Sequence, residues 1–166
     1  MVGGACNTGG NILRAFFTNN ELQSLTETIE KENMFELNLF GVRDADFFKS
    51  NAGGDFGLEV NDAVKKCESE RETCANDALF LCKIFSSIAK AEKRCYENAN
   101  AMGASVKLKK VYTSGGGAAN VTWCKMRSSC LSSDNPGSTI DVCASEYTEA
   151  SYGTALLAKQ GFRDKR

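Results

Sequence analysis

The chain has 166 residues, of which 42% are hydrophobic and 25% are charged, as is ordinary for a globular protein with a core of its own. Its formal net charge of -1 argues against a general nucleic-acid-binding protein, because neutralising phosphates requires a surplus of Lys and Arg. No apolar run approaches the roughly 20 residues that cross a bilayer, so we expect one domain over residues 1–166 without a membrane span.

The first predicted elements are two amphipathic helices. One lies in "ILRAFF" (residues 12–17), after a Gly-rich start, and the next lies in "NNELQSLTETIEKE" (residues 19–32). In both, the apolar residues recur at the spacing of one helical face. Asn19 or Asn20 is the predicted N-cap of the second helix, because a short polar side chain at that place can accept a backbone N–H bond.

Residues 34–70 contain three further predicted elements. "MFELNLFGV" (residues 34–42) alternates like a strand but is isolated among helices, so we expect a helical turn or a buried extended segment. "RDADFFKSN" (residues 43–51) predicts a short helix with Asp44 as its N-cap. "DFGLEVNDAVKKCESE" (residues 55–70) predicts an amphipathic helix, since its apolar residues share one face.

The stretch "CANDALFLCKIFSSIAKAEKRC" (residues 74–95) predicts one long helix. Residues 78–82 are apolar on every side, which is typical of a central helix that is buried all round. The later half becomes amphipathic, and Gly103 is the predicted terminator.

The last third of the chain predicts more helix. "SVKLKKVYTSGGGAA" (residues 105–119) alternates over too few residues to assign. "NVTWCKMRSSCLSS" (residues 120–133) predicts a helix with Trp123 and Met126 inward, and residues 138–160 predict one or two final helices. The whole pattern indicates an all-α fold of about seven or eight short helices with little strand.

Cysteine is the unusual component. The eight cysteines are even in number, contain no CxxC pair and accompany no histidine, so a zinc site is not indicated and four disulfides are the favoured interpretation. The predicted disulfide residues are Cys6, Cys67, Cys74, Cys82, Cys95, Cys124, Cys130 and Cys143. Disulfides imply secretion, and since no signal peptide is visible, we expect a mature chain whose signal peptide has been removed and to which Met1 was added.

Helix geometry limits which cysteines can pair. If Cys74, Cys82 and Cys95 share one helix, a rise of about 1.5 Å per residue separates neighbours by about 12 Å and 20 Å, whereas a disulfide needs Cα atoms within about 7 Å. Cys124 and Cys130 fail in the same way. We therefore expect bonds between the central group (Cys67 to Cys95) and the ends of the chain, which would give a compact, disulfide-crosslinked bundle.

No catalytic set is visible. Without histidine, Ser-His-Asp and Cys-His catalysis are excluded, and no motif calls for a cofactor or a metal, so we expect a protein that is not an enzyme. The aromatic central helix predicts an apolar ligand pocket, since a small helical bundle can keep part of its core open. Its predicted residues are Phe80, Ile84, Phe85, Ile88, Tyr112 and Trp123.

Two surface features remain open between a function and simple solvation. Lys107, Lys109 and Lys110 could attract an anionic ligand or partner, or could be a solvated basic face. "NVT" at Asn120 is a glycosylation sequon if the chain is secreted, and otherwise a chance occurrence.

The segment "CANDALFLC" (Cys74 to Cys82) resembles the paired cysteines of a late helix in the insect odorant-binding superfamily, which includes the D7 salivary proteins of blood-feeding flies. No two cysteines of this chain are three residues apart, unlike the pair typical of that family. The resemblance implies a secreted helical carrier that sequesters a small hydrophobic or amine ligand. The alternative hypothesis is a secreted salivary or effector-type protein that binds a host extracellular protein or receptor through its surface.

Overall fold

The computed structural model describes residues 9–37, 41–48, 60–104, 108–133 and 139–146, together with residues 155 and 159. Within these ranges the chain is mostly helical and has five α-helices, α1 (Gly10–Phe16), α2 (Asn19–Lys31), α3 (Val60–Arg71), α4 (Asp77–Ala99) and α5 (Val121–Ser132). The other described elements are the π-helix η2 (Asn100–Ala104), the 3-10 helix η3 (Gly116–Ala119) and the strands β1 (Lys110–Thr113) and β2 (Asp141–Ala144).

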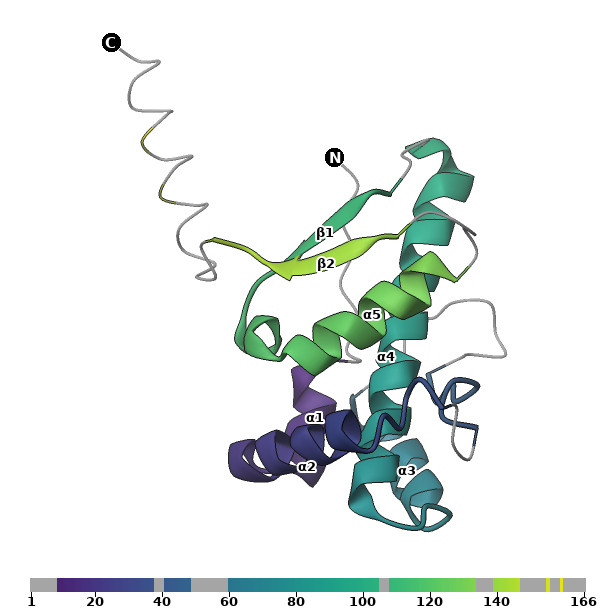
Figure 1. Cartoon of the computed structure of the whole chain (residues 1–166). Helices are drawn as coiled ribbons and strands as arrows, with labels where there is room; N and C mark the ends of the chain where they lie inside the picture. Colours follow the sequence, from purple (N-terminus) through teal and green to yellow (C-terminus); the bar gives the residue numbers. More distant parts are fainter. Residues whose placement is uncertain are drawn as a thin grey trace.

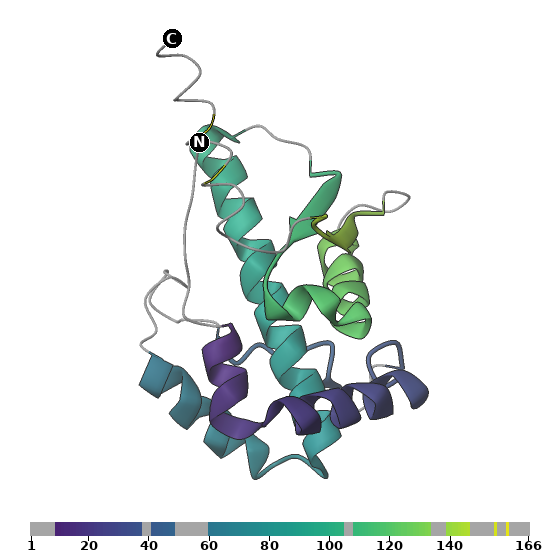
Figure 2. The same ribbon diagram turned by 90° about the vertical axis from the view of Figure 1, so that its left-hand side faces the viewer.

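Helix α4 is the axis of the molecule. Helices α1, α2 and α3 surround its N-terminal half, and α5 and the strands lie along its C-terminal half (Figures 1 and 2). The side chain of Asn76 caps it by accepting a 2.8 Å hydrogen bond from the Leu79 N–H. Residues 78–82 are buried, which confirms the predicted central helix. Gly103 has a φ of 92°, a conformation that favours glycine, and follows the last turn as expected.

The main core joins α1, α2 and α3 to the first half of α4. The ring of Phe80 is fully buried, and the Phe16 ring meets it edge-on at 5.2 Å between centroids. The predicted cap of α2 was wrong by one residue, because Thr18 forms a capping box with Glu21. The Glu21 carboxylate accepts bonds from the Thr18 N–H and hydroxyl, which lower the pKa of Glu21.

The segments between α2 and α3 form turns in the described residues. Met34 and Phe35 are buried in the turns that follow α2, so the described part of this segment takes the helical-turn form rather than a strand. Of the helix predicted over residues 43–51, residues 43–48 are instead turns and irregular chain, and residues 49–51 lie outside the described residues. Phe47 is nevertheless fixed, because its backbone N–H donates a 3.0 Å hydrogen bond to the buried hydroxyl of Ser87 on α4.

A small sheet corrects the all-α prediction. Strands β1 and β2 pair in parallel, with Lys110 opposite Asp141 and Thr113 opposite Ala144, and α5 connects them. A second core of Val111, Leu131 and Ile140 lies beneath the sheet. Residues 141–144, predicted as helix, are therefore strand, because pairing with a segment about 30 residues earlier decides their conformation.

The disulfide-crosslinked bundle of seven or eight helices is also wrong. None of the seven described cysteines forms a disulfide, and Cys6 lies outside the described residues. Cys82 and Cys95 share α4, and Cys124 and Cys130 share α5, as the sequence indicated, but Cys74 precedes the N-cap of α4. An even number of cysteines is a property of composition alone, whereas a disulfide requires two thiols to lie next to each other in the fold. Cys67 and Cys82 instead pack in the main core as small apolar side chains.

Burial makes two of these thiols resistant to alkylation. It raises the pKa of Cys67 and of Cys82 from the ordinary 9.0 to about 12, with Glu70 adding to the effect at Cys67. We expect iodoacetamide at pH 8 to leave both unlabelled in the folded protein and to label all seven described cysteines in denaturant without reductant, as read by peptide mass spectrometry. Labelling of Cys67 or Cys82 in the folded state, or blocked thiols in denaturant, would contradict this.

The same shift gives a pH dependence of stability. The thiol pKa is higher in the folded protein than in the unfolded chain, so unfolding releases a proton above pH 9. The free energy of unfolding therefore falls as the pH rises from about 9 toward 12.

Candidate functional groove

An open groove of about 810 Å³ lies where α1, α2, α4 and α5 meet. We call it the α2–α5 groove. Its apolar side chains are Leu13, Leu22, Phe85, Ile88, Ala119, Val121 and Trp123. Phe85 is buried, so the half-buried indole of Trp123 is the aromatic surface that the groove offers a ligand. A concave site with apolar walls and a few polar groups is typical of small-molecule binding.

The aromatic pair fixes the side of the groove formed by α4 and α5. The rings of Phe85 and Trp123 lie 4.8 Å apart between centroids at 31°, so the indole is held against the core. The Arg127 guanidinium lies 5.6 Å from the indole centroid, close enough for a cation–π contact. Both contacts come from buried residues and orient the only tryptophan of the chain.

The Trp123 indole N–H is a donor without a partner among the described residues. Gly117 of η3 lies beside it, and a Cβ at Gly117 would stand 3.5 Å from Trp123 Cδ1 and 3.6 Å from Nε1. Because glycine has no side chain, this edge of the indole stays open. A ligand with a carbonyl, ether or hydroxyl oxygen could accept a hydrogen bond there.

Polar side chains tie α2 to α5 along the rim. Glu30 accepts hydrogen bonds from Lys125 at 2.8 Å and from Thr122 at 3.1 Å, and these interactions lower the pKa of Glu30. Asn120 donates to the Thr26 hydroxyl at 3.2 Å. These contacts join segments more than 90 residues apart in sequence and hold the two walls of the groove together.

Asn120 also has a structural role that the sequence did not suggest. Its side-chain oxygen caps α5 by accepting a 2.8 Å bond from the Trp123 N–H, and its amide nitrogen is the donor to Thr26. A glycan on this nitrogen would replace one of its hydrogens next to the rim. Glycosylation at Asn120 stays a prediction.

The predicted pocket residues separate into three places. Phe85, Ile88 and Trp123 line the groove. Phe80 and Ile84 are fully buried in the main core, and Tyr112 is 68% exposed on β1. The sequence missed the contribution of α2, the residues Leu22, Thr26 and Glu30. Their spacing indicated a helical face, but no sequence signal said which helix that face would meet.

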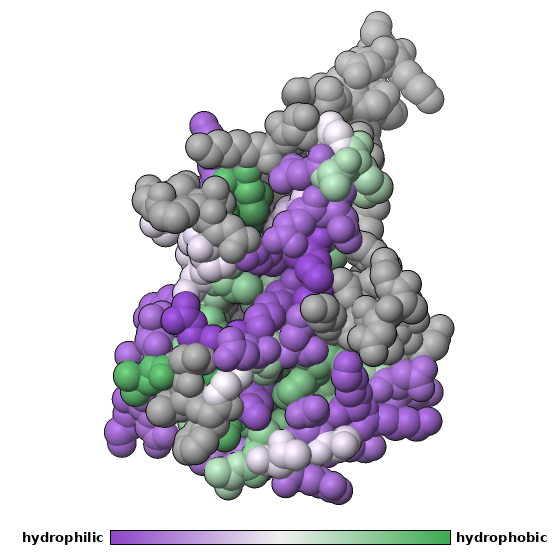
Figure 3. Space-filling model, turned by 90° about the vertical axis from the view of Figure 1, so that its right-hand side faces the viewer, coloured by the Kyte–Doolittle hydropathy of each residue, from purple (hydrophilic) through white to green (hydrophobic). Residues whose placement is uncertain are grey.

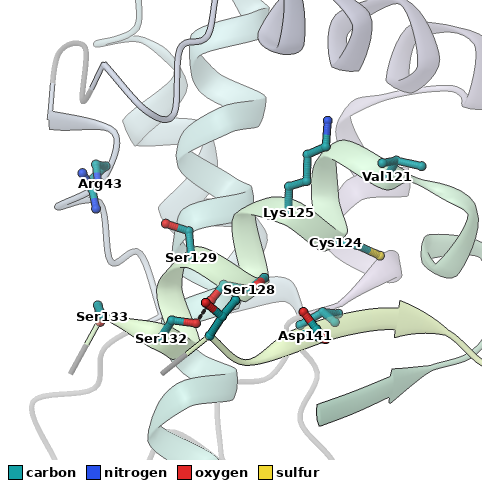
Figure 4. Close-up of a pocket in the computed structure, with 11 residues that line it drawn as sticks. Arg43, Val121, Cys124, Lys125, Ser128, Ser129, Ser132, Ser133 and Asp141 are labelled. Carbon is teal, nitrogen blue, oxygen red and sulfur yellow. Dashed lines mark hydrogen bonds between the residues drawn. The ribbon is translucent and has the colours of Figure 1, made fainter. Parts of the chain in front are cut away.

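A second cavity of about 600 Å³ lies between α5 and β2, lined by four serines, Arg43, Lys125 and Asp141 among others (Figure 4). Two of these serines, Ser128 and Ser132, hold neighbouring parts of the chain together. Ser128 donates to the Ile140 carbonyl at 2.6 Å, the Ile140 N–H donates to Ser132 at 2.9 Å, and Ser132 donates to the Ser128 carbonyl at 2.7 Å. Lys125 pairs with Glu30. The serine bonds therefore fasten Ile140, the residue before β2, to α5, and the Lys125 pair joins α5 to α2.

The predicted basic residues lie at the sheet. Lys109 and Lys110 are exposed at the start of β1, and Lys107 lies outside the described residues. The face shown in Figure 3, turned by 90° from the view of Figure 1, is mostly hydrophilic, and its apolar areas are small and separated by polar surface.

Within the described ranges, no three His, Cys, Asp or Glu side chains are grouped so that they could hold a metal ion. No described helix combines the length and the apolar character that crossing a membrane requires. No family model matches the sequence, and no solved structure matches the chain.

Proposed function

We propose that this protein binds a small, mainly apolar molecule in the α2–α5 groove. The observation that carries the proposal is the Trp123 indole, which lies tilted against the Phe85 ring and presents, beside Gly117, an N–H donor without a partner among the described residues. An apolar body would cover the half-buried indole, and an oxygen atom of the ligand would accept a hydrogen bond from the indole N–H. Apolar surface that the ligand and the groove remove from water would contribute about 25 cal/mol per Å² to the binding free energy.

An amine is the second ligand class that the groove supports. The carboxylates of Glu27 and Glu30 lie on its rim, and a cation above an aromatic face is favourable. Glu30 is already paired with Lys125, and Arg14 adds a positive charge to the same rim. These charges favour a neutral ligand over a cation.

Secretion, a carrier role and the resemblance of residues 74–82 to odorant-binding proteins remain part of this proposal. The resemblance supports a carrier of hydrophobic or amine ligands. The predicted absence of enzymatic activity belongs with it, since a carrier needs no catalytic group.

The single tryptophan gives a direct test. We expect N-phenyl-1-naphthylamine to quench Trp123 emission by energy transfer, because the probe would lie against the ring. 1-Octanol should then displace the probe better than octylammonium, which has the same tail but no acceptor. Displacement by octylammonium alone, weakened in Glu27→Gln, would favour the amine ligand. Absence of any quenching would contradict a ligand in the groove.

Filling the groove should remove binding. In Gly117→Leu the new side chain would lie against the open edge of the indole, and we expect probe affinity to fall about tenfold or more, which corresponds to about 1.4 kcal/mol. The matched control is Ala75→Leu, which places a leucine at an exposed position outside the groove. This variant should bind the probe like the natural chain. Equal loss in both variants would indicate that the probe binds elsewhere.

A further inference from the structure

In the part of the chain that the structure describes, the sheet has an open edge at β1. Among the described residues β1 pairs only with β2 (Figure 1). The Thr113 carbonyl accepts a 2.8 Å bond from the Ser145 N–H, and the Val111 carbonyl faces the Cys143 thiol at 3.7 Å. Backbone groups alternate sides along a strand, so the N–H and C=O of Lys110 and Tyr112 point to the opposite edge. None of these four backbone groups has a hydrogen-bond partner among the described residues, so they are available to a further strand.

The side chains at this edge are basic and aromatic. Lys110 and Tyr112 share the solvent face of β1, with the Lys110 ammonium 5.2 Å from the Tyr112 ring centroid. Lys109 is exposed beside them. Val111 turns the other way into the small core, which fixes which face is outward.

We propose that β1 accepts an acidic extended segment of a partner protein as a third strand. Main-chain hydrogen bonds would come from Lys110 and Tyr112, and an Asp or Glu of the segment would lie next to Lys110 on the outer face. Charge decides between occupants. A second copy joined through the same edge would bring Lys109 and Lys110 of both chains together, which like-charge repulsion disfavours. This site is separate from the α2–α5 groove and goes beyond the proposed function.

Two peptides of opposite charge test the proposal with the whole chain. We expect the acetylated and amidated peptide EVEVEV to bind at low salt and to shift the amide resonances of Lys110 and Tyr112, while KVKVKV does not bind. The double variant Lys109→Glu/Lys110→Glu should reverse this preference. No binding of EVEVEV, or equal binding of both peptides, would overturn the proposal.

The backbone contribution has its own variant. Tyr112→Pro removes an N–H that points to the open edge and leaves the N–H groups of Val111 and Thr113, which face β2, in place. We expect peptide affinity to fall about tenfold, whereas the matched control Tyr112→Val, which keeps the N–H, should retain most of it. Unchanged Trp123 emission checks that the variant is folded. Concentration-dependent self-association that Tyr112→Pro abolishes would identify a second copy as the occupant and overturn the acidic partner.

Discussion

Replacing Phe80 by alanine is expected to lower the free energy of unfolding by about 3–5 kcal/mol. Phe80 is fully buried on α4, and its ring contacts the rings of Phe16 and Phe17 at centroid distances of 5.2 and 5.9 Å. Truncation removes these contacts and leaves a cavity at the junction of α1 and α4. Urea unfolding followed by far-UV circular dichroism measures the change.

An exposed leucine provides the comparison for Phe80→Ala. Leu37 is 59% exposed, so Leu37→Ala should change the free energy of unfolding by about 0.5 kcal/mol or less. Because Phe80 lies outside the α2–α5 groove, Phe80→Ala should still bind N-phenyl-1-naphthylamine at temperatures where it is folded. A loss below 1 kcal/mol would mean that the main core is not packed around this ring.

Replacing Arg127 by methionine is expected to cost about 3 kcal/mol of unfolding free energy. Arg127 on α5 donates two hydrogen bonds to the Glu92 carboxylate on α4, at 2.7 and 2.6 Å, and the two side chains are only 9% and 19% exposed. Burial alone would lower the pKa of Arg127, but the bonds and charge of Glu92 outweigh it and raise the pKa. The variant would leave the Glu92 carboxylate without its cation in a partly buried place.

The control for Arg127→Met lies on the same helix. Lys125 pairs with Glu30 at 2.8 Å, but these side chains are 65% and 53% exposed, so Lys125→Gln should cost less than about 1 kcal/mol. The double variant Glu92→Leu/Arg127→Met should recover most of the loss, because no charge then remains unpaired. Equal losses of unfolding free energy for Arg127→Met and Lys125→Gln in urea would refute the claim that the buried ion pair stabilises the fold more than the exposed one.

Local patterns predicted the helices that carry the fold. The apolar run at residues 78–82 marked the central helix, the periodicity of residues 19–32 marked α2, and residues 120–133 contain α5 with Met126 inward. These predictions depend on residues within a few turns of one another. A helix makes its backbone hydrogen bonds within its own segment, so its sequence carries the signal.

The strand and disulfide predictions failed because they required knowledge of distant residues. The strand at residues 141–144 forms only because residues 110–113 lie beside it, and no periodicity over four residues can reveal that partner. The disulfides were inferred from a count, and the thiols of Cys67 and Cys82 are instead core side chains. A pairing between distant segments is a tertiary property in both cases.

Local sequence patterns were enough to predict a mostly helical protein with α4 as a buried axis, and most of the described phenylalanine rings lie in its core. Tertiary packing placed Phe85 and Trp123 along a groove and Phe80 in the main core, although all three were equal candidates from sequence. The reason is physical. Helical periodicity fixes which residues share a face, but the packing of α1, α2 and α5 against α4 decides which part of that face is covered.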